Sequence, residues 1–205
     1  MRDLPILGAP VPERADAARN RRRILDAAER LFTERGVEAV SMDDVAAAAA
    51  VGKGTLYRRF GDRAGLGIAV LDAREHELQD EIMGGPPPVG PGAPPGERLI
   101  AFVEAYLAYA WRNLELLVVA ETASPGARYR SGVYAGFRRH IEILFTAAGI
   151  DDPVLGAELL LAPLAGDFLR HLHVERGLGR DAIEVGLLRA AVRQLGELPD
   201  RRTPL

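Results

Sequence analysis

The side chains best suited to chemistry in this 205-residue chain lie in the stretch VGKGTLYRRF, residues 51–60. Small residues lead into a short expected helix whose inner face carries Leu56 and Phe60. A helix with such apolar anchors and a basic, hydroxyl-bearing front suits insertion into a DNA groove. The alternative is an ordinary solvated basic face. The outer face consists of Lys53, Thr55, Tyr57, Arg58 and Arg59.

The segments around this stretch must position it. An apolar stripe precedes it, and Gly36 is a natural residue for ending the helix that carries the stripe. Ser41 and Asp44 form a capping-box pattern that opens a second helix. Asp62 is expected to cap a fourth helix. The expected helices of this part are residues 17–35, 42–49, 53–60 and 62–83, and the second and third form a helix-turn-helix.

The remaining sequence is also helical in pattern. Residues 84–96, GGPPPVGPGAPPG, cannot form a helix or a central strand and predict a loop. Strand signals are absent, so the expected fold class is all-α with about nine helices. We expect a mobile arm over residues 1–15, a three-helix DNA-binding head over 16–62 and a second helical domain over 63–205. The further expected helices are residues 97–113, 114–120, 127–148, 153–174 and 180–198.

Composition narrows the class of function. The net charge is −3, yet arginines cluster at residues 19–23 and a second basic group runs from Lys53 to Arg63. Local patches, rather than total charge, decide the field that a nucleic acid meets. The chain has no cysteine, which excludes disulfides and thiolate chemistry. No signal-peptide pattern and no apolar run of about 20 residues is present. We expect a cytoplasmic protein with no membrane span, metal or cofactor.

The amino-terminal third resembles the TetR/AcrR family of transcriptional regulators. The first helix of the family is similar to RRILDAAERLFTERG, residues 22–36. Two residues depart from the family pattern: Ala50 stands at its turn glycine and Gly52 at the serine that caps its recognition helix. An L-residue in a left-handed turn costs about 1 kcal/mol. The other matching residues are Ser41, Val45, Ala46, Val51, Lys53, Gly54, Thr55, Leu56, Tyr57, Phe60, Asp62, Arg63 and Leu66.

The DNA contacts that we expect fall into two classes. Phosphate contacts hold a protein in register, and base contacts give specificity. Lys53, Thr55 and Arg58 are the candidates for base edges, since Lys and Arg address guanine and the Thr methyl can meet thymine. Gly54 belongs to the same motif. The phosphate candidates are Ser41, Tyr57, Arg63, Arg22 and Arg23.

One recognition helix reads too little sequence, so helix-turn-helix proteins commonly bind two half-sites as dimers. The expected helix 153–174 is apolar on nearly every side and must be buried on several faces. The resemblance implies that it and the last helix form a four-helix bundle with a second copy. The alternative is that both belong to the core of a single chain. The candidates are Leu161, Leu164, Phe168, Leu172, Leu187, Leu188, Ala191 and Leu195.

Aromatic side chains in the second domain suggest a site for a small hydrophobic effector, because such cavities are lined by aromatic rings with a few polar tips. Pro163 predicts a kink that leaves room beside it. The resemblance implies a ligand that shifts the fourth helix and so changes the spacing of two DNA-reading heads. The alternative is plain core packing. The candidates are Phe102, Tyr106, Tyr109, Trp111, Tyr134, Phe137, Phe168 and His171.

The sequence therefore predicts a sequence-specific regulator that binds double-stranded DNA as a homodimer. By resemblance it is a repressor that a small hydrophobic ligand releases from a palindromic operator. A helix-turn-helix regulator without an effector is the first alternative. An all-α enzyme is the second: Asp167 and His171 lie one helical turn apart, but no nucleophile accompanies them.

Overall fold

The computed structural model describes residues 12–196, and within that range it contains helices and no strand. The expected all-α class is confirmed. The chain divides into two compact units, Met1–Val70 and Leu71–Leu205. One helix, α4 (Arg63–Gly84), begins in the first unit and ends in the second.

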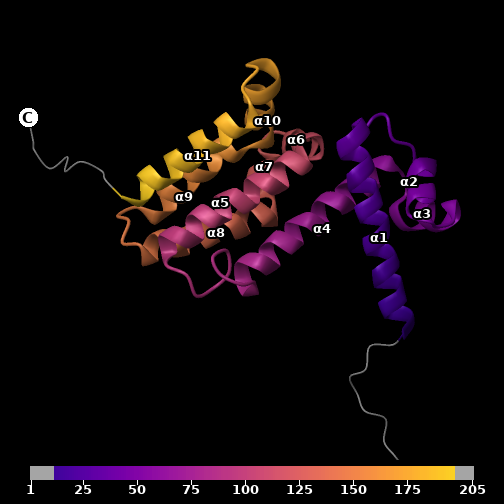
Figure 1. Cartoon of the computed structure of the whole chain (residues 1–205), viewed down its shortest axis with the longest axis horizontal. Coiled ribbons are helices and arrows are strands. Elements are labelled where there is room, and N and C mark those ends of the chain that lie inside the picture. The colour runs from indigo at the N-terminus through magenta and orange to yellow at the C-terminus, as the bar shows by residue number, and fades with distance from the viewer. Residues whose placement is uncertain (1–11, 197–205) are drawn as a thin grey trace, which may run out of the picture. The chain divides into compact units, whose positions relative to one another are not determined.

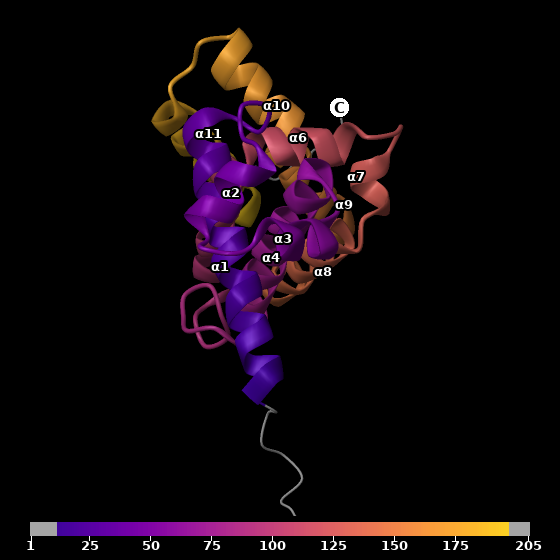
Figure 2. The ribbon, with the colours of Figure 1, turned by 90° about the vertical axis from the view of Figure 1, so that its right-hand side faces the viewer.

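The first unit contains α1 (Pro12–Arg35), α2 (Met42–Ala48), α3 (Lys53–Phe60) and the start of α4. Figure 2 shows α1 beside the two short helices. The first helix begins five residues before the expected residue 17, so residues 12–15 of the expected arm are helical. Proline is accepted at the first position of a helix, because the N–H that it lacks would have no helical partner there. Residues 1–11 of that arm lie outside the described residues.

Apolar side chains from all four helices form the core of the first unit. Ile24, Val45, Leu56 and Leu66 are each at most 1% exposed. They come from α1, α2, α3 and α4 in turn, at the stripe positions that the sequence predicts. Gly36 ends α1 with a φ of +79°, and its N–H donates to the Phe32 carbonyl at 2.9 Å. One small apolar core and capped helix ends therefore stabilise the first unit.

The second unit is a bundle of helices that follow the loop after Gly84 (Figure 1). Its core joins Phe102, Leu107, Phe145, Leu161 and Leu169. No described helix is both long and apolar enough to span a bilayer. The elements are α5 (Pro95–Arg112), α6 (Leu114–Thr122), α7 (Ala127–Arg130), α8 (Gly132–Ala147), α9 (Pro153–Leu161), a 3₁₀ turn (Ala162–Leu164), α10 (Gly166–Arg170), a π turn (His171–Glu175) and α11 (Arg180–Leu195).

Two expected helices are interrupted, which raises the number of α-helices among residues 12–196 from nine to eleven. The expected helix 127–148 breaks at Ser131, whose hydroxyl accepts a hydrogen bond from the Tyr134 backbone N–H at 3.0 Å and so caps α8. The expected helix 153–174 breaks around Pro163, where a 3₁₀ turn separates α9 from α10. A proline inside a helix removes a hydrogen bond and clashes with the preceding turn. The expected kink is therefore a full interruption.

Candidate functional site

The amino-terminal unit contains the expected helix-turn-helix, and its second helix is capped as predicted. The Ser41 hydroxyl accepts a hydrogen bond from the Asp44 N–H at 3.1 Å, and the Asp44 carboxylate accepts one from the Ser41 N–H at 3.0 Å. The Ser41 hydroxyl also donates to that carboxylate at 2.6 Å. These bonds hold the pKa of Asp44 below its usual value. A phosphate at Ser41 would therefore approach beside an ionised carboxylate.

The turn between α2 and α3 contains a strained alanine. Ala50 has a φ of +49° and is the one non-glycine residue with a positive φ over residues 12–196. The following N–H, of Val51, donates to the Ala46 carbonyl at 3.0 Å. The turn thus takes the left-handed form at the position where the sequence replaces glycine by alanine. Strain of this kind in an L-residue costs about 1–2 kcal/mol.

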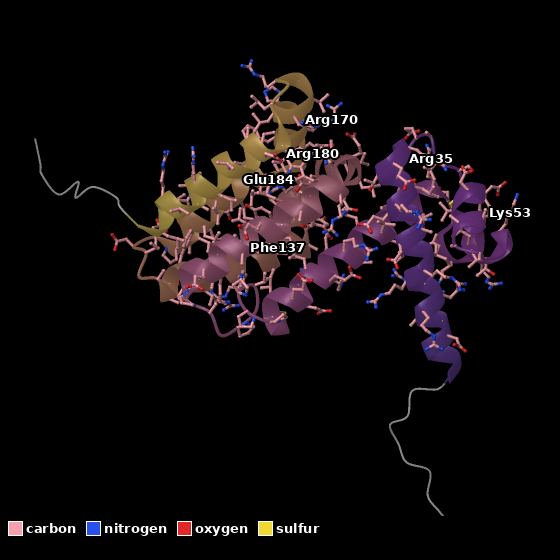
Figure 3. The ribbon with its side chains drawn as sticks, viewed as in Figure 1. Arg35, Lys53, Phe137, Arg170, Arg180 and Glu184 are labelled. Atoms are coloured by element: carbon pink, nitrogen blue, oxygen red, sulfur yellow. The ribbon has the colours of Figure 1, made fainter. Side chains whose placement is uncertain are left out.

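The predicted DNA-reading side chains of α3 share one surface. Leu56 anchors the helix in the core, while Lys53, Gly54, Tyr57 and Arg58 are exposed and Thr55 is partly exposed. Nearly half of the Tyr57 side-chain surface, 49%, is exposed although tyrosine is largely apolar. A Cβ atom added at Gly54 would meet nothing within 4 Å. Lys53 is labelled on this helix in Figure 3.

Two basic side chains of this region have partners within the unit. Lys53 Nζ lies 2.6 Å from Asp43 Oδ2. Arg63 donates to the Glu38 carbonyl at 2.6 Å and also pairs with the Glu38 carboxylate. These exposed pairs are weak, so a phosphate can compete for either cation.

Arg59 was placed on the outer face of α3 by the sequence but was given no DNA contact. Its guanidinium donates to the Ala17 carbonyl on α1 at 3.2 Å and so connects the recognition helix to the first helix. The two residues are 42 positions apart, and nothing in the local pattern indicates the contact. The two α1 candidates, Arg22 and Arg23, are exposed, and Arg23 donates to the Asn20 side chain at 3.2 Å.

The junction of α3 and α4 is very tight. The Asp62 carboxylate accepts a hydrogen bond from the Gly65 N–H at 2.8 Å, which is the predicted cap. A Cβ atom at Gly65 would lie 2.2 Å from the Phe60 carbonyl oxygen. Only glycine fits a backbone approach of that kind. The end of α3 and the first turn of α4 are therefore packed backbone against backbone.

In the second unit, four of the eight effector candidates come together. The rings of Phe102, Tyr106 and Phe137 lie 5.6–6.1 Å apart, and Tyr109 lies 5.7 Å from Tyr106. His140 joins them, with its ring 5.5 Å from Phe102. Figure 3 labels Phe137 within this bundle. The rings are buried, so they also serve as core, as the alternative reading expects.

The other four effector candidates lie apart from this cluster. Trp111 packs against His173 at 5.7 Å and under the Arg180 guanidinium at 5.2 Å. Tyr134 packs against Tyr129 at 5.2 Å. The remaining two, Phe168 and His171, are exposed on α10 and the π turn.

Sequence reasoning missed the polar groups around the ring cluster. The Tyr109 hydroxyl donates to Glu75 at 3.0 Å, and burial raises the pKa of the Glu75 carboxyl to about 7. Burial also lowers the pKa of His140 to about 4 and raises the pKa of Tyr106. Glu75 falls on the stripe of Leu71 and Leu78, and a carboxylate on an apolar stripe is the signal that would have found it.

A buried ion pair lies beside these residues. Arg128 pairs with Glu121 and donates to the Leu161 carbonyl at 2.8 Å. Glu121 also accepts a hydrogen bond from the Gly166 N–H at 2.7 Å, and burial raises its pKa. The pair joins α6 and α7 to the interrupted segment after α9, so it helps to fix that interruption.

Three predicted dimer residues belong to the core of the single chain. Leu161, Leu164 and Ala191 are at most 1% exposed and have no side-chain surface left for a second chain. These three residues do not fit the predicted dimer surface. For Leu161 and Leu164 the reason is the interruption at Pro163, which turns different faces of the apolar segment inward. Leu172, Leu187, Leu188 and Leu195 are partly buried against the same core, and Phe168 is 40% exposed.

Other apolar side chains remain at the surface of the same helices. On α9, Leu155 and Leu159 are more than half exposed, and on α11 Val185 and Val192 are about half exposed. An exposed small-residue row, Ala182, Gly186 and Ala190, runs along α11.

Asp167 and His171, which lie one helical turn apart in the sequence, do not pair with each other. The His171 ring nitrogen instead meets the Glu175 carboxylate at 2.7 Å, and this bond lowers the pKa of Glu175. Asp167 accepts a hydrogen bond from the Phe168 N–H at 2.8 Å. No cluster of metal-ligating side chains occurs over residues 12–196.

Comparison with known proteins identifies relatives of this chain. Residues 24–70 match the family described as bacterial regulatory proteins, tetR family. A helix-turn-helix-type transcriptional regulator of Mycobacterium tuberculosis is 35% identical over 135 residues. The match covers 64% of this chain and 64% of that relative, so about a third of the relative has no counterpart in the match.

Two solved structures show the same fold over most of the chain. A transcriptional regulator of Saccharomonospora viridis, solved in complex with choline, has a TM-score of 0.65 at 23% identity and covers 83% of this chain and 94% of its own. A TetR/AcrR-family regulator of Thermobifida fusca has a TM-score of 0.63 at 22% identity, with coverage of 85% and 97%. At these identities the likeness concerns the fold.

Proposed function

Through its amino-terminal unit the chain belongs to the TetR/AcrR family of helix-turn-helix transcriptional regulators, and we propose that it is a repressor that a small ligand releases from a palindromic operator. The main support for DNA binding is the surface of α3, where Gly54, Tyr57 and Arg58 are exposed around the buried anchor Leu56. A short, basic, well-anchored helix after a tight turn fits the major groove.

The five DNA-facing residues of α3 each have a role in this proposal. Arg58 and Lys53 address guanine edges, and Thr55 meets a thymine methyl. The Tyr57 hydroxyl donates to a phosphate, which explains why so large a ring remains at the surface. Gly54 lets the helix backbone approach the DNA. Arg22, Arg23 and Arg63 add phosphate contacts that position the head, and Ser41 adds one at the start of α2.

The repressor acts as a homodimer through α9 and α11. Leu155, Leu159, Val185 and Val192 supply exposed apolar area on these helices. The row Ala182, Gly186 and Ala190 allows a second copy to approach closely, and a Cβ atom at Gly186 would meet nothing within 4 Å. The partly buried Leu187 and Leu188 flank this surface.

A small ligand acts through the second unit. The ring cluster of Phe102, Tyr106, Tyr109 and Phe137 lies against α4, the helix that continues into the DNA-binding unit. A ligand can release DNA only if it binds one arrangement of the dimer better than the other. Choline in the Saccharomonospora viridis regulator supports a small-molecule site in a protein of this fold.

The DNA-binding test is a titration of labelled duplex. Genomic fragments retained by the purified chain at low salt would identify the operator, and fluorescence anisotropy would then measure affinity. We expect Arg58→Ala to lose about 1–3 kcal/mol of binding and to relax specificity at one base pair. Tyr57→Phe should weaken binding to all sequences alike. Arg176→Ala, which removes an exposed arginine outside the first unit, is the control. No retention of any fragment, or equal affinity of all variants, would refute the proposal.

The dimer is tested separately. Val185→Glu together with Val192→Glu should give monomers in sedimentation and lose cooperative operator binding, while Val119→Glu on α6 should not. A monomeric wild-type chain that still binds the full operator would refute dimerisation.

The second candidate is a helix-turn-helix regulator without a ligand. It is favoured by the burial of Phe102 and Tyr106, which are 0% and 3% exposed. Screening small metabolites by thermal shift, followed by operator release, separates the two candidates. Catalysis is not part of the proposal.

A further inference from the structure

We propose that the ring cluster beside Glu75 binds a small organic cation whose charge pairs with the Glu75 carboxylate. This rests on the proposed ligand-responsive function and names the class of ligand. The rings concerned are Phe102, Tyr106, Tyr109 and Phe137, all within the second unit.

The surroundings of the rings are negatively charged. Glu75 lies partly buried on α4 and accepts a hydrogen bond from the neutral Tyr109 hydroxyl at 3.0 Å. Asp72 and Glu121 make its surroundings more negative, and His76 offsets them only weakly. A buried carboxylate without a cation is unfavourable, which is why its pKa rises to about 7. A cationic ligand would supply the missing charge.

The nearby protein cation, Arg128, is already engaged. Arg128 pairs with Glu121 and donates to the Leu161 carbonyl at 2.8 Å. Its guanidinium also lies over the Tyr134 ring at 5.3 Å. Arg128 therefore compensates Glu121, and Glu75 remains the carboxylate without a partner of opposite charge among the described contacts.

The rings of the cluster are tilted against one another. Their centroids are 5.6–6.1 Å apart, with tilted or edge-to-face planes, so faces of different rings point in different directions. Ring faces attract ammonium groups, most strongly where water is excluded. Several tilted rings beside one carboxylate favour a tetraalkylammonium or protonated amine over a neutral ligand of equal size.

The rings are closed on one another in the absence of ligand. Binding must part them and move Tyr109 away from Glu75. Because Glu75 belongs to α4, occupation of this site acts directly on the helix that begins at Arg63 in the DNA-binding unit.

The test compares three probes of similar shape. Phenyltrimethylammonium is the cation, tert-butylbenzene is its neutral isostere, and benzoate is an anion that Arg128 would attract. We expect calorimetry to give a dissociation constant for the cation at least about tenfold lower than for the isostere, a difference within the range of one desolvated cation–ring contact and one ion pair. Benzoate should bind more weakly still.

Variants of the carboxylates assign the effect. Glu75→Gln should remove most of the preference for the cation, whereas Glu81→Gln, which removes an exposed charge from the same helix, should retain it. Tyr109→Phe keeps the ring and frees the carboxylate, so it should bind the cation at least as tightly as the wild type. Circular dichroism checks folding, and Tyr109→Phe remains informative if Glu75→Gln does not fold.

Several outcomes would overturn the proposal: no binding of the cation at millimolar concentration, equal binding of the isostere, tighter binding of benzoate, or an unchanged preference in Glu75→Gln. Operator release is measured in parallel. A neutral compound that releases DNA independently of Glu75 would refute the cation site and leave the repressor intact. A cation that binds through Glu75 without releasing DNA would leave the cation site intact and refute the proposed release of the operator by a ligand.

Discussion

Lys53 on the recognition helix is held by Asp43 on the preceding helix, with Nζ and Oδ2 2.6 Å apart. This hydrogen bond raises the pKa of Lys53. Both side chains are more than half exposed, so the pair contributes little to stability. Its effect falls on DNA binding, because the carboxylate competes with DNA for the lysine.

We expect Asp43→Asn to bind duplex more tightly than the wild type and to raise the magnitude of the salt slope by up to about 1, the contribution of one added phosphate contact. Asp80→Asn removes the same charge from the exposed part of α4 in the second unit and should change neither. Adding Lys53→Ala to Asp43→Asn should cancel the gain. An Asp43→Asn variant with weaker binding would mean that the pair positions Lys53 instead of restraining it.

Gly54 is the second residue of α3, and a Cβ atom there would meet nothing within 4 Å. Alanine is favoured over glycine in a helix, by at most about 0.8–1.0 kcal/mol, the value for a helix interior. Gly54→Ala should therefore raise the free energy of unfolding and yet weaken operator binding, because the new methyl group projects from the DNA-facing surface. Gly132→Ala, at an exposed position of α8, should leave operator affinity unchanged. Chemical denaturation and anisotropy measure the two quantities, and unchanged affinity would remove Gly54 from the interface.

Ala50 adopts the left-handed conformation that glycine takes with less strain. The strain costs about 1–2 kcal/mol. The greater conformational entropy of glycine in the unfolded chain offsets about 0.5–1 kcal/mol of the stability gained when the strain is removed. Ala50→Gly should thus stabilise the head by about 0.5–1 kcal/mol. Ala47→Gly, on the exposed face of α2, should destabilise it by a similar amount. If both variants lose stability in urea unfolding, the turn is not strained in solution.

The pH dependence of stability should contain two opposing contributions. Burial raises the pKa of Glu75 to about 7 from 4.5, so the folded state holds a proton that the unfolded state releases between these values. Stability from Glu75 is therefore full below pH 4.5 and is lost as the pH rises to 7. His140 has its pKa lowered from 6.5 to about 4, so its neutral form contributes stability that is lost as the pH falls through that range.

Glu75→Gln isolates the first contribution. Relative to the wild type, the variant should gain stability between pH 4.5 and 7, by at most about 3 kcal/mol. Trp111, the one tryptophan of the chain, reports the unfolding of the second unit by fluorescence. Parallel curves for the two proteins would show that Glu75 titrates at its ordinary pKa. The groups that act on Glu75 are Tyr109, Asp72, Glu121 and His76.

Local signals predicted much of the fold. The Ser41–Asp44 capping box, the cap at Asp62 and the loop after Gly84 all depend on short-range chemistry, and all are present. The helix-turn-helix could also be predicted from the sequence, because its apolar anchors and its turn lie within a few residues of one another. The break at Ser131 was missed because a single serine inside an apolar pattern is as common on a helix surface as at a cap.

Contacts between distant residues were beyond the reach of one sequence. Leu161 and Leu164 looked like interface residues because an all-round apolar helix does not indicate which neighbour covers each face. Arg59 and Ala17, or Arg128 and Leu161, meet across 42 and 33 positions with no periodic signal. The aromatic residues could be identified as a group, but which of them share one cluster depends on how the helices pack.

The missing Cβ at Gly65 has a mechanical consequence. Because the Gly65 backbone packs directly against the Phe60 carbonyl, the recognition helix and the start of α4 cannot shift relative to each other. They must rotate as one rigid body. Even one methyl group at Gly65 would push these two segments apart and change the orientation of the recognition helix, although every DNA-facing side chain would still be present.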